Sequence, residues 1–152
     1  MEKLNKNDYF LEVGCAQGYY LKKALNKTKN VYGIDVIKEF IMNAKTTGAN
    51  VKLANGEEIP FNKKFDKILC TETIEHIPNY KKAINKMKNK LNKNGKIIIT
   101  IPLEKSYFWR LFSIIYPPEK YRGHINLLNS NELIELFKPL KVKKRFLFKL
   151  HF

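Results

Sequence analysis

The segment LEVGCAQG, residues 11–18, is the most informative part of this sequence. It joins a short apolar run at 9–13 to a stretch in which apolar residues recur at helical spacing. A turn between a strand and a helix needs small residues where the backbone bends tightly or approaches a ligand, and Gly14, Ala16 and Gly18 supply them at alternate positions. The segment therefore predicts a strand, a glycine turn and a helix whose N-terminus can receive a ligand. By itself it also fits an ordinary tight loop.

The next apolar run, residues 31–34, ends at Asp35. A carboxylate at the end of a second strand can accept hydrogen bonds from both hydroxyls of a ribose. It can equally cap the helix that we expect to begin at Ile37. Strand, turn, helix and strand together form a βαβ unit.

The same alternation continues through most of the chain. We expect helices at 37–45 and 80–91, strands at 51–54 and 65–70, a turn at 92–95 and a strand at 96–101 that is buried on both faces. A last helix at 131–137, with Ser130 as its N-cap, should precede a strand at 142–150. This order predicts an α/β fold, namely a Rossmann-like, doubly wound and mainly parallel sheet with helices on both faces.

Length and composition favour one packed domain. The chain has 152 residues, and a single core usually occupies about 100 to 200, so we expect residues 1–152 to form one domain. Cys15 and Cys70 lie in separate apolar runs, which excludes a CxxC metal site and a disulfide framework. We see no apolar stretch of about 18 residues and no signal-peptide core, and therefore expect a cytoplasmic protein.

The chain is strongly basic, with 29 Lys and Arg against 14 Asp and Glu and a net charge of +15. Such a charge suits a nucleic-acid partner. However, only three of the cations are Arg, the residue preferred for bidentate contacts with phosphate and guanine. A solvated lysine surface is the favoured interpretation, while an anionic substrate, a nucleic acid and peripheral membrane contact stay open.

Several ordered segments resemble the class I S-adenosylmethionine-dependent methyltransferases, and within them the small-molecule branch that includes ubiquinone and menaquinone biosynthesis enzymes. Besides LEVGCAQG, the resemblance rests on VYGIDV at 31–36, NGEEIPF at 55–61, FDKILCTETIEHIPN at 65–79 and KNGKIIITIP at 93–102. It covers nearly the whole chain. It implies binding of S-adenosylmethionine and release of S-adenosylhomocysteine.

The resemblance also implies roles for individual residues. Glu12 would support the methionine amino group, Asp35 would bind the ribose hydroxyls, and Val36 would lie against the adenine face. Asn55 replaces the usual Asp, so its carbonyl oxygen would have to accept the adenine amine. The other cofactor-binding residues implied are Gly14, Cys15, Ala16, Gly18, Gly56, Glu57, Cys70 and Thr71. No metal is implied.

The catalytic residues are not identified by the sequence, because a sulfonium methyl donor does not require a base. His76, after the fourth strand, is a candidate base or substrate contact, and its alternative is a structural histidine. His124 is a second candidate, and its alternative is a residue at the start of the last helix.

An aromatic insertion at 104–123 separates the fifth strand from the last helix. It fits a substrate lid, a helix packed against the sheet, or a membrane-contacting helix. Relative to the family the chain is short at both termini, and the C-terminal segment has length for one strand rather than two. The incomplete sheet edge could accommodate an oligomer partner.

The expected function is methyl transfer from S-adenosylmethionine to a small-molecule or lipid-like acceptor, because an apolar insertion suits an apolar pocket. An RNA methyltransferase and a non-catalytic cofactor-binding scaffold subunit are the alternatives. A nicotinamide-dependent dehydrogenase is disfavoured, since the last glycine of its G-x-G-x-x-G motif is missing.

Overall fold

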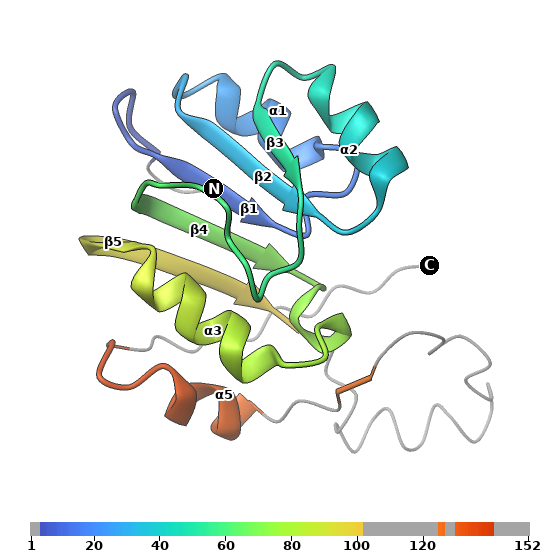
Figure 1. The fold of residues 1–152 in the computed structure, drawn as a ribbon. Helices are drawn as coiled ribbons and strands as arrows, with labels where there is room; N and C mark the ends of the chain where they lie inside the picture. The colour runs from blue at the N-terminus through green and yellow to red at the C-terminus, as the bar shows by residue number, and fades with distance from the viewer. Residues whose placement is uncertain (1–3, 102–124, 127–129, 142–152) are drawn as a thin grey trace, which may run out of the picture.

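The computed structural model describes residues 4–101, 125–126 and 130–141, and these form a five-stranded sheet flanked by helices (Figure 1). The strands are β1 (Phe10–Val13), β2 (Val31–Asp35), β3 (Asn50–Leu53), β4 (Phe65–Thr71) and β5 (Leu91–Thr100). The helices are α1 (Tyr19–Leu25), α2 (Lys38–Lys45), α3 (Tyr80–Asn89) and α5 (Ser130–Leu136), together with the short 3-10 helix η1 (Ile74–His76).

The strand order is β3-β2-β1-β4-β5, and every pair is parallel. The chain builds outward from β1 to β3 and then returns to the other side of β1 with β4. The carboxyl ends of β1 and β2 on one side, and of β4 on the other, therefore meet at one edge of the sheet. Ligands of doubly wound folds bind at such a reversal of strand order.

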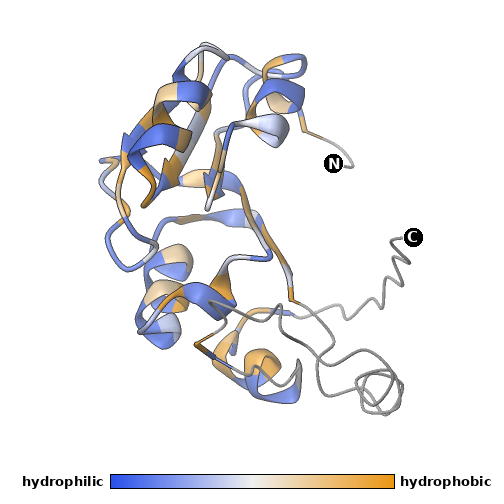
Figure 2. Cartoon of the chain, turned by 90° about the vertical axis from the view of Figure 1, so that its right-hand side faces the viewer, coloured by the Kyte–Doolittle hydropathy of each residue, from blue (hydrophilic) through white to orange (hydrophobic). Residues whose placement is uncertain are grey.

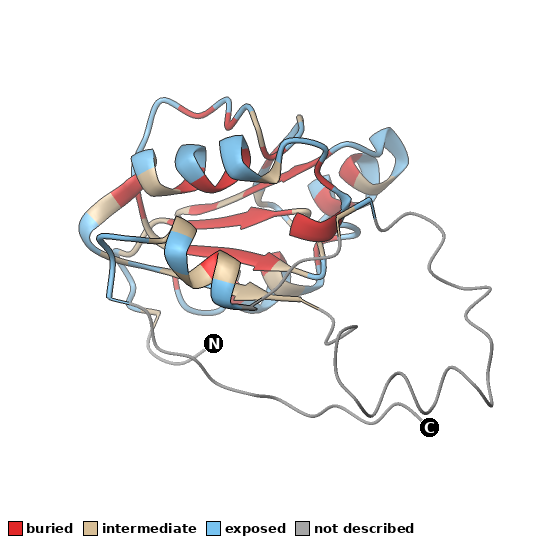
Figure 3. Ribbon diagram, turned by 90° about the horizontal axis from the view of Figure 1, so that it is seen from below, coloured by how far each residue is buried: buried red, intermediate tan, exposed pale blue. Residues whose placement is uncertain are grey.

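Two apolar cores lie on opposite faces of the sheet. One face packs β1 and β4 against α3 through Leu11, Ile68 and Ile84, and Leu133 of α5 joins the same cluster. The other face packs α1 and α2 against the sheet through Leu21 and Ile41, among others. Figure 3 shows the strands mainly buried and the helices exposed on their outer sides. Figure 2 shows the corresponding hydropathy, with hydrophobic strand segments and helices of mixed character. The predicted doubly wound fold with helices on both faces is confirmed.

The segment around residues 92–95 differs from the expected turn. The helix α3 ends at Asn89, and β5 already begins at Leu91, which pairs with Phe65. Pairing then moves to Lys96 opposite Lys67, so residues 92–95 form an irregularity inside β5. The Asn and Gly residues bend the chain here, but they do so within a strand, because Leu91 is already held in the sheet.

The fifth strand is also less buried than expected. Ile97 and Ile99 pack partly against the core, whereas Ile98 is 44% exposed, so the expectation of burial on both faces is wrong. Ile98 is exposed because β5 is the outermost strand on its side of the described sheet. An isoleucine run alone does not distinguish a central strand from one at an edge.

The last described helix, α5, is fastened to α3 by polar contacts. The Tyr80 hydroxyl donates to Glu132 Oε1 at 2.5 Å, and Lys88 Nζ donates to the carbonyls of Leu136 and Lys138 at 3.0 and 2.7 Å. The helix begins at Ser130 itself, so the expected cap residue is its first residue. The insertion at 104–123 and the strand expected at 142–150 lie outside the described residues. Within the described part of the chain, we find no helix that is long and apolar enough to span a membrane.

Substitution of Gly33 tests how closely α1 packs on β2. A Cβ at Gly33 would lie 2.9 Å from Leu21 Cδ1 and 3.0 Å from Cys15 Sγ. Gly33→Ala should therefore lower the free energy of unfolding by about 1–3 kcal/mol through overpacking, measured by urea denaturation. The exposed α2 substitution Asn43→Ala is the control and should change stability little. An unchanged Gly33→Ala midpoint would contradict the packing described here.

Candidate functional site

The turn between β1 and α1 is held against the end of β2 by backbone hydrogen bonds. The amides of Gly14 and Cys15 both donate to the Ile34 carbonyl at 2.9 Å, and Gly18 N–H donates to the Cys15 carbonyl at 2.8 Å. The N-terminus of α1 thus follows a turn whose shape is fixed by the neighbouring strand. The partial positive charge of a helix N-terminus favours an anionic or polar ligand group.

Three residues of this turn have left-handed backbone conformations. The φ angles are +75° at Gly14, +42° at Ala16 and +87° at Gly18. At Gly14, a Cβ would lie only 2.2 Å from Thr73 Oγ1, so this glycine is required by a protein side chain as well as by its φ. Thr73 is a site residue that the sequence analysis missed, because only the folded loop after β4 brings it to the turn. Ala16 retains the positive φ despite its Cβ, which stores strain at the site.

Asp35 joins the turn to the second strand. Its Oδ2 accepts the Ala16 N–H at 2.8 Å, and its Oδ1 accepts the Ile37 N–H at 2.9 Å. The carboxylate is buried, yet each oxygen retains a further acceptor position. The capping role that we considered for Asp35 is therefore present in the structure. By its chemistry each oxygen can also accept from a second donor, such as a sugar hydroxyl.

Glu12 is buried in β1 on the same side as Asp35. Its Oε2 has no hydrogen-bond partner among the residues that the structure describes. Burial, with the nearby negative charge of Asp35 as a second cause, raises the pKa of Glu12 from 4.5 to about 8, although a hydrogen bond from the Leu21 backbone opposes this shift. A buried carboxyl with an unused oxygen fits a ligand that brings a hydrogen-bond donor or a positive charge.

Large apolar side chains are exposed around the same edge of the sheet. Val36 is 65% exposed and Ile37 is 44% exposed, directly after Asp35, and Tyr19 is 64% exposed directly after Gly18. An exposed apolar side chain next to a carboxylate that can bind hydroxyl groups is suited to contact with a flat base. The exposure of Val36 is compatible with the adenine contact that the resemblance implies for it.

The loop after β3 is organised by its own polar groups. Asn55 Oδ1 accepts the Glu57 N–H at 2.8 Å. The Glu57 carboxylate accepts the Asn79 N–H at 3.2 Å and forms an ion pair with Lys82 at 3.4 Å. Glu57 thus connects this loop to the start of α3. A Cβ at Gly56 would lie 2.6 Å from Ile77 Cδ1, so Gly56 permits close packing against the loop after β4.

The remaining predicted site residues divide into core and surface positions. Cys70 is fully enclosed, and burial raises the pKa of its thiol, so its side chain belongs to the core. Thr71 is half-buried at the end of the strand, and His76 is exposed in η1. Cys15 is also buried, which raises the pKa of its thiol to about 12. His124 lies outside the described residues.

Residues 125–126 lie against η1 and the residue that follows it, although they are far from them in sequence. The amides of Ile125 and Asn126 both donate to the Glu75 carbonyl at 3.1 Å. Asn126 Nδ2 donates to the Ile77 carbonyl at 2.7 Å. The segment next to His124 is therefore fastened to η1, beside the carboxyl end of β4.

Two cavities of the described residues lie away from the glycine turn. One, of about 440 Å³, lies between α2 and β3, and the other, of about 430 Å³, lies near the start of β4. Among the described residues, no three His, Cys, Asp or Glu side chains are grouped as metal ligands.

The residues at the glycine turn fit S-adenosylmethionine on three structural observations. Glu12 has a buried oxygen that could accept from the methionine ammonium, Asp35 has remaining acceptor positions for hydroxyl groups, and the Val36 side chain is exposed and could contact the base. Glu12, Asp35 and the turn are brought together, while Asn55, Gly56 and Glu57 form the adjoining loop.

The buried Glu12 carboxyl makes stability depend on pH. Because its folded pKa lies above its unfolded pKa, the native state binds the extra proton, and stability falls as pH rises from about 4.5 towards 8. The slope approaches about 1.4 kcal/mol per pH unit at most. Glu12→Gln should remove this slope, so its stability relative to wild type should increase steadily from pH 5 to pH 8. Denaturation at several pH values measures the difference, and the exposed Glu39→Gln serves as control. A difference between Glu12→Gln and wild type that does not change with pH would refute the raised pKa.

Comparison with known proteins adds independent findings. An uncharacterized protein of Methanocaldococcus jannaschii is 33% identical over 88% of this chain and 63% of its own length. A tRNA U34 carboxymethyltransferase of Nautilia profundicola is 34% identical over 62% of this chain and 34% of its own. A ubiquinone biosynthesis O-methyltransferase of Rickettsia typhi is 27% identical over 93% and 64%, respectively. The chain thus spans less than two thirds of the length of these relatives.

Comparison with solved structures shows a similar fold. The crystal structure of the YcgJ protein from Bacillus subtilis superposes with a TM-score of 0.75 at 17% identity, covering 89% of this chain and 62% of that one. The family model described as "Methyltransferase domain" matches residues 1–140, which include every described element of the sheet and its helices. The chain therefore belongs to the methyltransferase domain family.

Proposed function

We propose that the chain binds S-adenosylmethionine and transfers its methyl group to a small-molecule or lipid-like acceptor. The observation that carries this proposal is the 2.8 Å hydrogen bond between Ala16 N–H and Asp35 Oδ2. It brings the glycine turn, which would receive the amino-acid part of the cofactor, next to the carboxylate that would receive its ribose. The family resemblance assigns these two roles to these two places.

Each part of the cofactor has a chemically suitable partner. The methionine ammonium would stabilise the ionised form of Glu12 and so oppose the burial that raises its pKa. The ribose hydroxyls would donate to the remaining acceptor positions of Asp35. Adenine would lie against Val36, with the Asn55 loop at its edge. The end of β4, at Thr71, would then be closest to the reacting methyl group.

The proposed reaction demands positioning more than acid–base catalysis. S-adenosylmethionine supplies a methyl group on a sulfonium, whose sulfur leaves with the C–S bond electrons as a new bond forms from the acceptor atom to the methyl carbon. The chain has to hold the acceptor in line and exclude water. An acceptor O–H or N–H loses its proton to solvent or to an exposed side chain such as His76.

Two observations favour a small-molecule or lipid-like acceptor. The ubiquinone biosynthesis relative aligns over most of this chain, and the exposed Tyr19 and Ile37 suit an apolar ligand near the site. An RNA acceptor is the second candidate, favoured by the tRNA-modifying relative and the net charge of +15. That relative aligns over a smaller part of this chain.

Asp35 and Asp66 provide a matched test of the cofactor site. Asp66 also accepts a backbone N–H, from Tyr9 at 2.8 Å, but it lies at the start of β4, at the opposite end of the sheet. Asp35→Asn should weaken binding of S-adenosylhomocysteine by about 1.5–3 kcal/mol, through loss of hydrogen bonds to a charged group, measured by titration calorimetry. Asp66→Asn should leave the affinity unchanged. Equal affinities for wild type and Asp35→Asn would exclude the proposed site.

The acceptor class is tested by radiolabelled methyl transfer. We expect label from S-adenosylmethionine to enter a prenylated catechol and not unmodified tRNA, because the exposed Tyr19 and Ile37 suit an apolar acceptor and a catechol hydroxyl supplies the nucleophilic oxygen. The Asp35→Asn variant controls for contaminating activity. Label in tRNA alone would replace the small-molecule proposal with the RNA one.

A further inference from the structure

The cavity near the start of β4 has an unusual lining. Its volume is about 430 Å³, and its walls are formed by Asn62, Lys63, Lys64, Asn89 and Lys90. These residues come from the loop before β4 and from the end of α3. All five side chains end in amide or ammonium groups, so the cavity offers hydrogen-bond donors and positive charge beside the aliphatic stems of its lysines.

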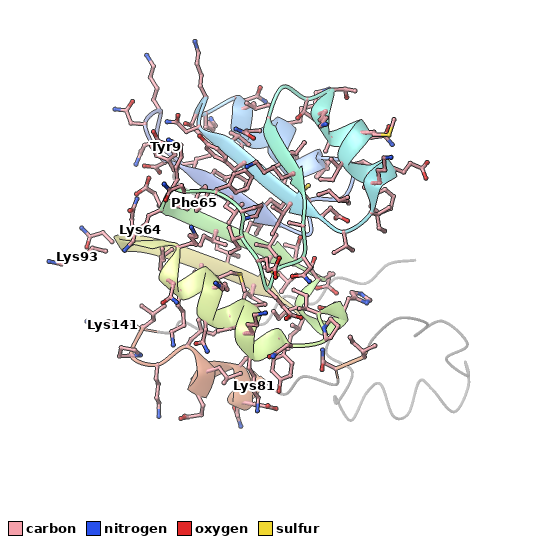
Figure 4. All side chains as sticks on the ribbon, in the orientation of Figure 1. Tyr9, Lys64, Phe65, Lys81, Lys93 and Lys141 are labelled. Atoms are coloured by element: carbon pink, nitrogen blue, oxygen red, sulfur yellow. The ribbon has the colours of Figure 1, made fainter. Side chains whose placement is uncertain are left out.

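The cavity lies at the end of the sheet opposite the cofactor site. It adjoins the amino end of β4, whereas Asp35 and Thr71 lie at carboxyl ends. The seven residues of β4 separate the two ends by roughly 20 Å. Figure 4 shows Lys64 and Lys93 extending from this amino end, where Tyr9 also lies. A ligand in this cavity would therefore occupy a site separate from the proposed cofactor.

The local charge is strongly positive. The residues that line the cavity include three Lys and no Asp or Glu. The nearby Asp66 contributes one negative charge, since its oxygens accept from neutral donors, Tyr9 N–H at 2.8 Å and Asn92 Nδ2 at 2.6 Å. The C-terminus of α3 contributes about half a negative charge. The three lysines of the lining outweigh Asp66 and this helix end together.

Two of the three lysines make contacts with other parts of the protein. Lys90 Nζ donates to the Phe61 carbonyl at 2.5 Å, and it retains further N–H donors. Lys63 Nζ lies 5.2 Å from the centre of the Tyr9 ring, within the range of a cation–π contact. Ordering these side chains before a ligand arrives reduces the entropy lost on binding.

The other cavity shows that lysines alone do not define this site. It also has three lysines, Lys38, Lys45 and Lys52, but Ile41, Met42, Val51 and Leu53 make up the rest of its lining. Lysine ammonium groups serve as point-charge partners of phosphate, and amide groups add neutral donors. Only the cavity near β4 combines both without apolar side chains among its lining residues.

We propose that the cavity formed by Asn62, Lys63, Lys64, Asn89 and Lys90 binds a phosphate group. The group can belong to a free phosphorylated molecule or to a nucleic-acid backbone, since both present the same oxyanion. The site does not depend on the proposed methyl transfer.

Two double variants test the proposal, and each of them removes two positive charges from the protein. Lys63→Gln/Lys64→Gln alters the cavity near β4, and Lys38→Gln/Lys45→Gln alters the other cavity. Pyrophosphate is titrated into each protein and followed by amide chemical shifts in NMR spectra, and a 12-nucleotide RNA is titrated by fluorescence anisotropy at several salt concentrations. We expect saturable shifts at residues 62–64 and 89–90. The first variant should bind at least tenfold more weakly, and the second should bind as wild type does.

The outcomes separate the sources of phosphate. RNA binding at least a hundredfold tighter than pyrophosphate, with the same dependence on Lys63 and Lys64, identifies a nucleic-acid backbone, whereas similar affinities identify a free phosphorylated ligand. Equal loss in both double variants, shifts spread over the surface, or no binding would overturn the proposal, because diffuse charge would then account for any attraction. Affinity for S-adenosylhomocysteine should stay unchanged in both variants, which keeps this test independent of the cofactor site.

Discussion

The contact between the Ala16 amide and the Asp35 carboxylate is the constraint on which the site depends. It joins two neighbouring parallel strands at their carboxyl ends and fixes the turn that starts α1. The Ile37 amide holds the other carboxylate oxygen, so the carboxylate cannot rotate away. The acid is therefore oriented by the fold itself before a ligand binds. Preorganisation of this kind lowers the cost of binding.

Two features of the candidate cofactor site lower the stability of the folded protein when no ligand is bound. Ala16 has a positive φ that a glycine would adopt without strain, and Glu12 carries a buried oxygen without a partner among the described residues. Both features cost folding free energy in the absence of ligand. A ligand that brings an ammonium to Glu12 would recover part of this cost. Strain and unsatisfied polar groups of this kind commonly gather at functional sites.

Much of the fold could be predicted, because the periodicity of apolar residues directly reflects burial. The βαβ unit around Gly14 and Asp35 follows from the sequence, and so does the parallel order of the later strands. The exposure of Ile98 could not be predicted, because the position of a strand within a sheet depends on topology rather than on its own residues. The bulge at 92–95 was interpreted as a turn for a similar reason, since Leu91 pairs with a distant strand.

The site was less predictable than the fold. Glycine at position 14 was expected to make room for a ligand, yet Thr73 fills the space beside it, and no local pattern reveals a contact between loops so far apart in sequence. Cys70 was expected beside the cofactor and is enclosed in the core, because an apolar residue in a strand gives no indication of which face it occupies. The cation-lined cavity was equally hidden, since its lysines come from separate segments.

Amide hydrogen exchange with and without S-adenosylhomocysteine tests the central claim most directly. If the glycine turn and the end of β2 form one binding site, saturating ligand should slow exchange together at residues 14–18 and 35–37. Exchange in the distant loop at 62–64 should not change. Absence of protection at the turn, or protection confined to the cavity between α2 and β3, would contradict the account.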